Sequence, residues 1–308
     1  MGLATVCGLS EEANMAIETG ISYAKSTING WIGCTQIGPG CDGCYALAGD
    51  IRFHGGKHWG PDAPRQRTAP SNWNKAFTWN RRAAKSGEFW PVFWNTQSDM
   101  FDNEIDEQWR ADAWDLMAQT PYLTWLVVTK RIGNAKRMLP ADWGTGYPNV
   151  WLIATVVNQE EAERDIPKLL DLDACVKGIS HGPGLGPMDL TFQLKSGRHA
   201  GKAAIEELDW IISEGESRQG SWAAREYKLE WAESLAEQAS RYDVPFFMKQ
   251  AGHFPTRNGA KVTLTGKGAV VGEWPTALQR QEFPGGKTLA EGTDSPSITG
   301  AVIQLAVV

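Results

Sequence analysis

Short apolar segments recur along the chain and alternate with stretches that have helical periodicity. Several of them are near-continuous apolar runs, such as Leu126-Val127-Val128 and Phe246-Phe247-Met248. Strands that are buried on both faces of a parallel sheet have this character, because helices cover the sheet on both sides. The seven predicted strands are Asn29–Gly33, Pro91–Asn95, Leu123–Thr129, Val150–Val157, Cys175–Ser180, Asp209–Ser213 and Val244–Lys249.

Two of the intervening stretches show the apolar spacing of an amphipathic helix. The segment Asn103–Thr120 places apolar side chains three and four residues apart and ends before Pro121, and Trp222–Tyr242 repeats the pattern. Repeated strand–helix alternation predicts β/α units, and seven strands predict a partial or complete (β/α) barrel. We therefore expect an α/β protein whose chemistry lies at the carboxyl ends of the strands.

The last part of the chain differs in composition, because Gly, Pro and Thr are frequent there and only short strand-like pieces occur. We predict a barrel domain over residues 1–251 and a small irregular, β-containing appendage over residues 252–308. The strand-like pieces of the appendage are Lys261–Thr265, Ala269–Val271 and Ala301–Val308.

Composition excludes two broad classes of protein. Hydrophobic residues make up 42% of the chain and charged residues 21%, so a fully disordered chain is excluded. The sequence has no apolar run of the ~18 residues that a membrane helix needs. The first residues include Glu11 and Glu12 and lack a basic leader before an apolar stretch, which argues against a secretory signal. We expect a cytoplasmic protein that does not contact a membrane.

The strongest chemical signal is a cluster of three cysteines directly after the first predicted strand. Cys34, Cys41 and Cys44 form a C-x6-C-x2-C set in a loop rich in Gly and Pro, whereas Cys7 and Cys175 are isolated and predicted to be unliganded. An odd number of cysteines is a poor disulfide framework, and thiolates are soft ligands that suit zinc or an iron–sulfur cluster.

Two kinds of metal site are compatible with this loop. A structural zinc needs four protein ligands, so His54 or His58 would complete the three thiolates. An iron–sulfur cluster that is held by three cysteines leaves one iron open, and an open iron can chelate S-adenosylmethionine. The position of the loop, at the expected catalytic end of a β/α barrel, favours the cluster.

The cysteine loop and the barrel pattern together resemble the radical SAM superfamily, whose hallmark is three closely spaced cysteines after the first strand of a partial β/α barrel. More narrowly, the chain resembles a phage-associated group that is named by phage gene-product numbers, which would place it in the cytoplasm of a bacterial host. The similarity spans residues 19–255. The matching stretches are 33–45, 92–101, 126–131, 149–152, 185–187, 209–217 and 245–250.

The resemblance implies a [4Fe-4S] cluster on Cys34, Cys41 and Cys44, S-adenosylmethionine as cofactor, and a reductant such as flavodoxin or ferredoxin. It also implies that polar residues after the strands contact the cofactor. Asn95, Ser98 and Asp99 would accept hydrogen bonds from its ammonium group, Lys130 or Arg131 would hold its carboxylate, Asn158 and Gln159 would bind its ribose, and Tyr45 and Glu216 would supply further contacts.

The chain departs from these patterns at three places. The commonest radical SAM spacing is C-x3-C-x2-C with an aromatic residue before the third cysteine, where this chain has Gly43. The narrower group usually has an acidic residue in the segment that reads Ser180-His181-Gly182-Pro183 here. It also usually has Gly-Gly-Glu-Ser where this chain has Glu214-Gly215-Glu216-Ser217. The Gly182 and Glu214 departures fall in the expected substrate pocket.

A basic segment suggests a class of substrate. The whole chain has a formal net charge of −6, yet residues 51–86 contain eight basic residues and one acidic residue, with Trp59, Trp73, Phe77 and Trp79 among them. Positive charge with stacking rings is typical of sites for single-stranded or flipped bases. The alternative is a solvated basic helix whose aromatic side chains face the core. Two functions follow: a radical SAM enzyme that modifies a nucleic acid or nucleotide, or a non-enzymatic, zinc-stabilised nucleic-acid-binding protein.

Overall fold

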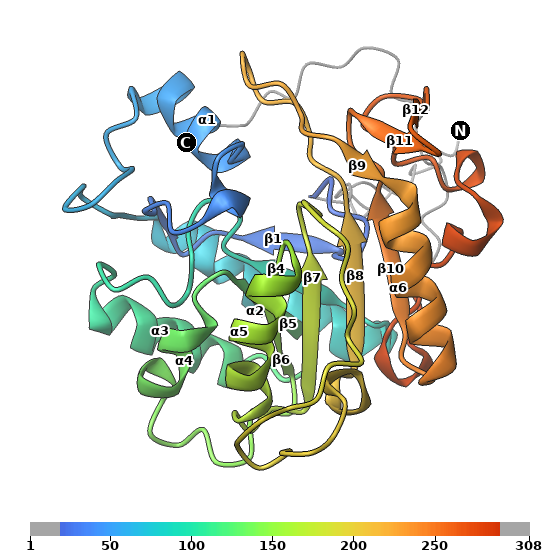
Figure 1. The fold of residues 1–308 in the computed structure, drawn as a ribbon. Helices are drawn as coiled ribbons and strands as arrows, with labels where there is room; N and C mark the ends of the chain where they lie inside the picture. Colours follow the sequence, from blue (N-terminus) through green and yellow to red (C-terminus); the bar gives the residue numbers. More distant parts are fainter. Residues whose placement is uncertain (1–18, 290–308) are drawn as a thin grey trace, which may run out of the picture.

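The computed structural model describes residues 19–289, so Cys7 and the predicted piece Ala301–Val308 lie outside the described residues. Seven parallel strands form one curved sheet in the order β1-β4-β5-β6-β7-β8-β10 (Figure 1). This order leaves β1 and β10 as the two edges, so the sheet is a partial barrel, as predicted. The strands are β1 (Ser26–Ile28), β4 (Pro91–Trp94), β5 (Thr124–Thr129), β6 (Val150–Thr155), β7 (Val176–His181), β8 (Trp210–Glu214) and β10 (Phe246–Gln250).

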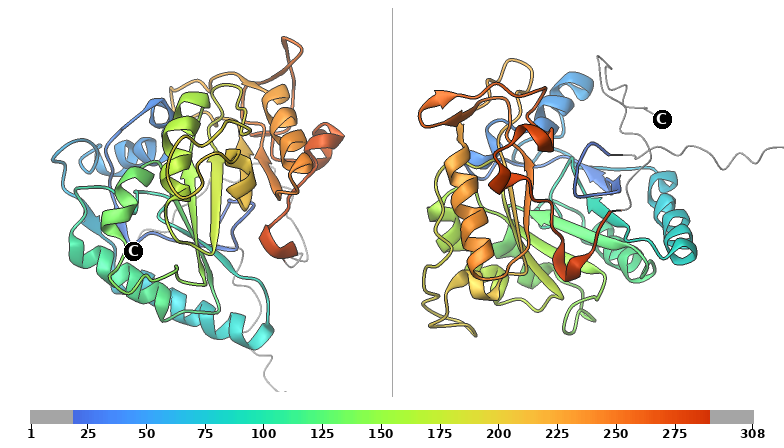
Figure 2. Two further views of the ribbon diagram at one scale, coloured as in Figure 1. Left: turned by 60° about the horizontal axis from the view of Figure 1, so that its bottom comes forward. Right: turned by 90° about the vertical axis from the view of Figure 1, so that its right-hand side faces the viewer.

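The helices that follow the strands cover the convex face of this sheet (Figures 1 and 2). Their bounds are α2 (Pro70–Ser86), α3 (Glu107–Ala118), α4 (Ile132–Met138), α5 (Gln159–Leu170) and α6 (Leu229–Arg241). α1 (Tyr45–His54) differs, because it lies above the carboxyl ends of the strands (Figure 1). Within the described residues, no helix has the length and apolar character needed to cross a membrane.

The concave face of the sheet is apolar near its amino edge and polar near its carboxyl edge. Trp151, Trp210 and Phe247 form an aromatic cluster there with Tyr23 and Phe283. Because side chains two residues apart share a face of a strand, the next residues on this face are polar. Asn95 follows Phe93, Thr155 follows Ile153, Glu214 follows Ile212 and Lys249 follows Phe247. The barrel therefore has an apolar floor and a polar mouth.

The first predicted strand, Asn29–Gly33, is wrong in position. β1 ends at Ile28, and β2 (Trp31–Ile32) pairs with β3 (Gln66–Arg67) in a separate small antiparallel sheet. The chain leaves the main sheet here because the Gly30 N–H donates to Asn95 Oδ1 at 2.7 Å. Gly30 also lies flat against Trp94, where a Cβ would come within 2.7 Å of the indole.

Two other predicted elements are shorter than expected. The helix predicted over Trp222–Tyr242 begins only at Leu229, because Tyr227–Lys228 forms β9 and pairs with β11 (Pro255–Arg257). The helix predicted over Asn103–Thr120 begins at Glu107, since the Asp106 side chain caps it by accepting from the Gln108 N–H at 2.8 Å.

The described part of the C-terminal segment forms a small sheet and then returns to the barrel. β12 (Ala260–Lys261) joins β11 and β9 in the small sheet, whereas the predicted strand Ala269–Val271 leads into a 3-10 turn over Val271–Glu273. Residues 280–282 then pair with β10, where the Met248 N–H donates to Arg280 O at 2.9 Å. This contact covers one edge of the sheet, and an unpaired edge strand would otherwise be open to aggregation.

Candidate functional site

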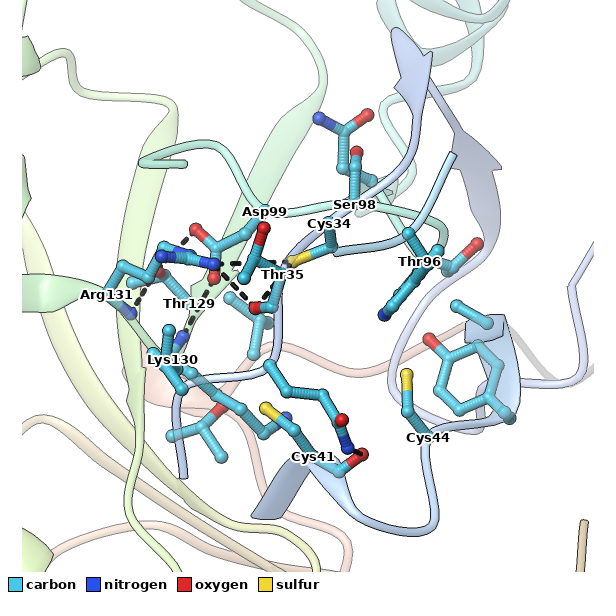
Figure 3. Close-up of a pocket in the computed structure, with 18 of the residues that line it drawn as sticks. Cys34, Thr35, Cys41, Cys44, Thr96, Ser98, Asp99, Thr129, Lys130 and Arg131 are labelled. Carbon is cyan, nitrogen blue, oxygen red and sulfur yellow. Dashed lines mark hydrogen bonds between the residues drawn. The ribbon is translucent and has the colours of Figure 1, made fainter. Parts of the chain in front are cut away.

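The three clustered cysteines lie at the mouth of the partial barrel. Cys34 follows β2, Cys41 ends a 3-10 turn over Pro39–Cys41, and Cys44 is the N-cap residue of α1. All three line one cavity of about 110 Å3, and Figure 3 shows their sulfur atoms facing the same space. The loop therefore brings all three cysteines to the wall of one cavity, and their role as metal ligands stays a prediction.

The rest of the cavity wall comes mainly from the ends of β4 and β5. Six of the polar residues expected from the sequence are in this wall together with the three cysteines and Thr35. They are Tyr45, Asn95, Ser98, Asp99, Lys130 and Arg131. The polar mouth that the strand ends were expected to form is thus assembled on the side of the barrel where the cysteine loop lies.

Cys34 sits beside a fixed cation. The Arg131 guanidinium lies 3.8 Å from Cys34 Sγ and donates to Thr35 O at 2.6 Å. Burial and, to a smaller extent, the Asp99 carboxylate raise the pKa of Cys34 to about 12, against the opposing effect of Arg131. A metal at Cys34 would bind the thiolate and displace its proton, and Arg131 would stabilise the resulting negative charge. Arg131 is therefore oriented toward the cysteine loop, and its fork is not free to hold a cofactor carboxylate.

Cys44 has a second cation nearby. Burial raises the pKa of Cys44, and Lys130 is among the groups that lower it. Lys130 Nζ has no hydrogen-bond or ion-pair partner among residues 19–289, and its methylene groups lie against Gly40. Of the two basic residues at the end of β5, Lys130 is thus the one that is available to an anionic ligand in the cavity.

Asp99 ties the two strands of the wall together. Its Oδ1 accepts from Thr129 Oγ1 at 2.7 Å and from the Phe101 N–H at 2.9 Å, and its Oδ2 accepts from the Lys130 N–H at 3.0 Å. Three of its roughly four acceptor sites are occupied. Asp99 is buried, so its main effect is to hold the end of β5 against the loop after β4.

Asn95 carries an unused donor into the same wall. The residue has a φ of 61°, a left-handed conformation that asparagine tolerates better than most side chains. Its Oδ1 is occupied by the Gly30 N–H, whereas its Nδ2 is buried without a partner. Asn95 is therefore better placed to donate than to accept, and its contact with an ammonium group stays a prediction. A ligand acceptor in the cavity would satisfy it.

Three selected residues lie outside the cavity wall. Asn158 caps α5 by accepting from the Glu161 N–H at 2.9 Å, and Gln159 bonds to Glu163 and to the backbone of Asp189. Glu216 binds Arg225 and lies behind the cysteine loop. The prediction that these three contact the cofactor is not supported by their positions, because local capping and ion pairing use the same residue types as ligand binding.

The zinc alternative requires a fourth ligand from His54 or His58. His58 is buried, and its Nδ1 lies 2.6 Å from Asp50 Oδ1, while the His58 N–H donates to Asp50 Oδ2. The His54 ring stacks edge-on against His58 at 5.1 Å. Among the described residues, no group of three or more His, Cys, Asp or Glu side chains is arranged to hold a single metal ion.

The basic segment divides into a buried part and an exposed part. Trp73 and Trp79 are buried in the core between α2 and the sheet, so they follow the alternative of aromatic side chains that face the core and do not stack on bases. They lie six residues apart on the apolar face of α2, which packs inward. Arg81 and Arg82 are exposed, but they lie near the end of α2 that leads into the start of β4. That end is opposite the mouth, because α2 runs antiparallel to the strands.

The two sequence departures in the expected substrate pocket touch each other. Glu214 and Lys249 form an ion pair of 2.5 Å at the mouth, on the strands across from Asn95 and Lys130. A Cβ on Gly182 would lie 2.6 Å from Glu214 Oε1, so only glycine leaves room for this carboxylate. Lys249 was not among the residues expected at the site. A charged residue directly after the apolar run Phe246-Phe247-Met248 is a signal for a position at the mouth of the barrel.

A buried histidine ends the neighbouring strand β7. The ring of His181 is fully buried, with Nε2 3.1 Å from Gly186 O and Nδ1 3.2 Å from Ser213 Oγ. The carbonyl can only accept, so Nε2 carries a proton. Burial lowers the pKa of His181 to about 4, from an ordinary value near 6.5.

We expect His181 to make folding stability depend on pH. The unfolded chain binds this proton below about pH 6.5 and the folded chain only below about pH 4. Stability is therefore lost as the pH falls through this window, by roughly 3 kcal/mol in total. The measurement is the free energy of unfolding in urea from pH 7 to pH 4, for the parent and His181→Gln. The variant should show a shallower decline, and equal declines would contradict the assignment.

The fold and the site together define an α/β protein of the partial-barrel type, with a thiol-lined cavity at the carboxyl edge of its sheet. The chain belongs to the family described as "Protein of unknown function (DUF5131)", whose model matches residues 18–284. A comparison with curated proteins gave no match. Among solved structures, a mutant of spore photoproduct lyase is similar at 11% sequence identity and a TM-score of 0.38. The match covers 71% of this chain and 68% of that chain, and similarity this low carries no functional weight.

Proposed function

We propose that this protein is a radical S-adenosylmethionine enzyme that holds a [4Fe-4S] cluster on Cys34, Cys41 and Cys44. The observation that carries the proposal is the convergence of three thiols on one cavity at the mouth of a seven-stranded partial barrel. Three thiolates leave one iron of such a cluster open for the cofactor. When both groups are bound, they supply an electron transfer that cleaves the sulfonium bond and a 5′-deoxyadenosyl radical that abstracts hydrogen from a substrate.

The donors in the cavity support this set of ligands. Arg131 stabilises the Cys34 thiolate, and Lys130 is a free cation close to Cys44. The cofactor carries a carboxylate, which Lys130 can bind, and oxygen acceptors, which the unpartnered Asn95 Nδ2 can bind. Ser98 has a smaller role, because its hydroxyl already donates to Trp31 O at 3.1 Å. These residues orient the cofactor, and the apolar floor below them excludes water from the reacting atoms.

The substrate would lie toward β8 and β10, where Glu214 and Lys249 form the polar half of the mouth. A nucleic acid or nucleotide substrate stays a prediction. It now depends on the exposed basic residues and on Trp59, which lines the cavity, because Arg65 is buried and Trp73 and Trp79 belong to the core. The reductant, a flavodoxin or ferredoxin, is likewise a prediction from the resemblance.

Purification without oxygen tests the proposal. We expect a brown protein with broad absorbance near ~400 nm and about equal amounts of iron and sulfide. After addition of dithionite and S-adenosylmethionine, the protein should release 5′-deoxyadenosine. A colourless protein that carries one zinc ion would overturn the proposal and support the zinc-stabilised binding protein. Reconstituted protein that holds iron but makes no 5′-deoxyadenosine would support the cluster and contradict the radical chemistry.

A further inference from the structure

The segment between β8 and β9 contacts the cysteine loop, although the two are far apart in the sequence. We name residues 216–226 the strap. It starts directly after β8 and ends at β9, and in Figure 1 it is the gold segment that rises above β8 toward the N-terminal part of the chain. The strap contacts a segment that is distant in the sequence. Arg225 Nη1 lies 3.1 Å from Oδ2 of Asp42, a residue between Cys41 and Cys44 in the chain.

The base of the strap is held rigidly. Gln250 Nε2 donates to Gly215 O at 3.0 Å and lies 2.9 Å from Ser217 Oγ, and the His253 N–H donates to Glu216 O at 2.9 Å. A Cβ on Gly215 would lie 2.2 Å from Ala251 O, so the backbones of the two strand ends are in direct contact. The strap therefore leaves the sheet in one direction.

The middle of the strap is closed by a buried carboxylate. Glu216 Oε1 accepts from Arg225 NH2 at 2.6 Å, and Glu216 Oε2 accepts from Arg225 Nε at 3.0 Å and from the Arg225 N–H at 2.9 Å. The Glu216 side chain is 5% exposed, so this fork is largely shielded from solvent. Bidentate pairs of this kind fix geometry as well as charge. The third nitrogen of the Arg225 guanidinium, Nη1, donates to Asp42 Oδ2.

The cysteine loop is shaped to receive the strap. A Cβ on Gly43 would lie 2.4 Å from both Glu216 Oε1 and Trp222 Nε1, so only glycine permits this contact. Gly43 is one of the sequence departures noted above, and the structure explains it. The space beside the third cysteine is already filled by Trp222 from the strap, whose ring lies 5.7 Å from the Arg225 guanidinium.

We propose that Arg225 is a positioning residue, which acts through Glu216 and Asp42 to hold the Cys41–Cys44 half of the loop in the geometry that binds a cluster. The Cys34 half is held separately by Arg131. The two halves of the thiol set thus depend on two different arginines. This inference rests on the proposed function for the purpose of the strap, but the holding itself is a property of the metal-free chain.

The test is the rate at which each thiol of the metal-free protein reacts with iodoacetamide, measured by mass spectrometry of cysteine peptides. In Arg225→Ala, labelling of Cys41 and Cys44 should rise about tenfold, because a charge-assisted fork no longer opposes local opening. Cys34 should keep its parent rate and serves as the internal control. Arg241→Ala removes an exposed pair with Glu237 on α6 and should change no rate.

A second variant approaches the contact from the loop. Gly43→Ala leaves Arg225 in place but introduces the Cβ that Glu216 and Trp222 exclude, so it should raise the same two rates. Unchanged rates at Cys41 and Cys44 in both variants would overturn the inference, and so would an equal rise at Cys34, which would indicate general unfolding. Because no metal is present, these outcomes are separate from failure of the proposed function, which the iron content of the parent reports.

Discussion

Cys41→Ala protein, purified and reconstituted without oxygen, is expected to be nearly colourless and to form 5′-deoxyadenosine at less than about one hundredth of the parent rate. Losing a residue that merely supports a metal ligand typically costs 10–100-fold, so loss of the ligand itself should cost more. Cys41 lies in the cavity wall with Cys34 and Cys44, and two thiols alone cannot hold the cluster with a single open iron. Iron content, absorbance and product formation are measured together.

The matched control for this prediction is Cys175→Ala. Cys175 is exposed and lies just before β7, at the opposite edge of the sheet from the cavity, so its loss should leave iron content and product unchanged. If Cys41→Ala protein still made 5′-deoxyadenosine at the parent rate, the ligand assignment would be wrong. Equal losses in both variants would point to oxidation or misfolding and would also count against a specific ligand role.

Arg65→Ala is expected to lower the free energy of unfolding by roughly 3–5 kcal/mol, the usual cost of removing one partner of a buried ion pair. The Arg65 side chain is 2% exposed. Its guanidinium donates to Asp102 Oδ2 at 3.0 Å and to Thr35 Oγ1 at 2.8 Å, and it reaches three backbone carbonyls, those of His58, Gly60 and Ala63. Its removal leaves the buried Asp102 carboxylate and these carbonyls short of donors.

Denaturant unfolding of three variants checks this prediction. Arg65→Lys should recover little, because one ammonium group cannot replace five planar donors. Arg82→Ala is the control from the same basic segment, and its exposed side chain should matter by less than about 0.5 kcal/mol. A loss below about 1 kcal/mol in Arg65→Ala would contradict the role of Arg65 as the centre of a buried network.

The roles of the basic residues show where sequence reasoning stops. Arg65 and Arg82 stand in one charged stretch and look equivalent, yet one is buried under the cysteine loop and the other is in solvent. Helical periodicity could have separated Trp73 and Trp79 from the solvent face of α2, because both lie on its apolar side. No local pattern could have shown that Arg65 contacts Thr35 and Asp102, since those contacts join segments 30 and 37 residues apart.

The asparagine and glutamate residues differ for a related reason. Asn95, Asn158 and Glu216 all follow strands, as the functional residues of a barrel do. Only the structure shows that Asn95 lines the cavity and keeps a buried donor without a partner, whereas Asn158 caps a helix and Glu216 binds Arg225 of the strap. The residue type, which the sequence gives, fixes the hydrogen bonds that a side chain can make. The segments that pack against it in the fold determine which partner it has.

The sequence by itself determined six of the seven strands of the parallel sheet, since apolar runs bounded by turns bury themselves wherever helices can cover them. It also determined the set of three thiols, since their spacing is local. Tertiary structure alone decided which polar residues face the thiols, that Gly182 makes room for Glu214, and that Arg225 reaches Asp42 from 183 residues away. The physical reason is that burial and periodicity act over a few residues, whereas the pairing of charges and hydrogen bonds depends on which distant segments the sheet brings to the same edge.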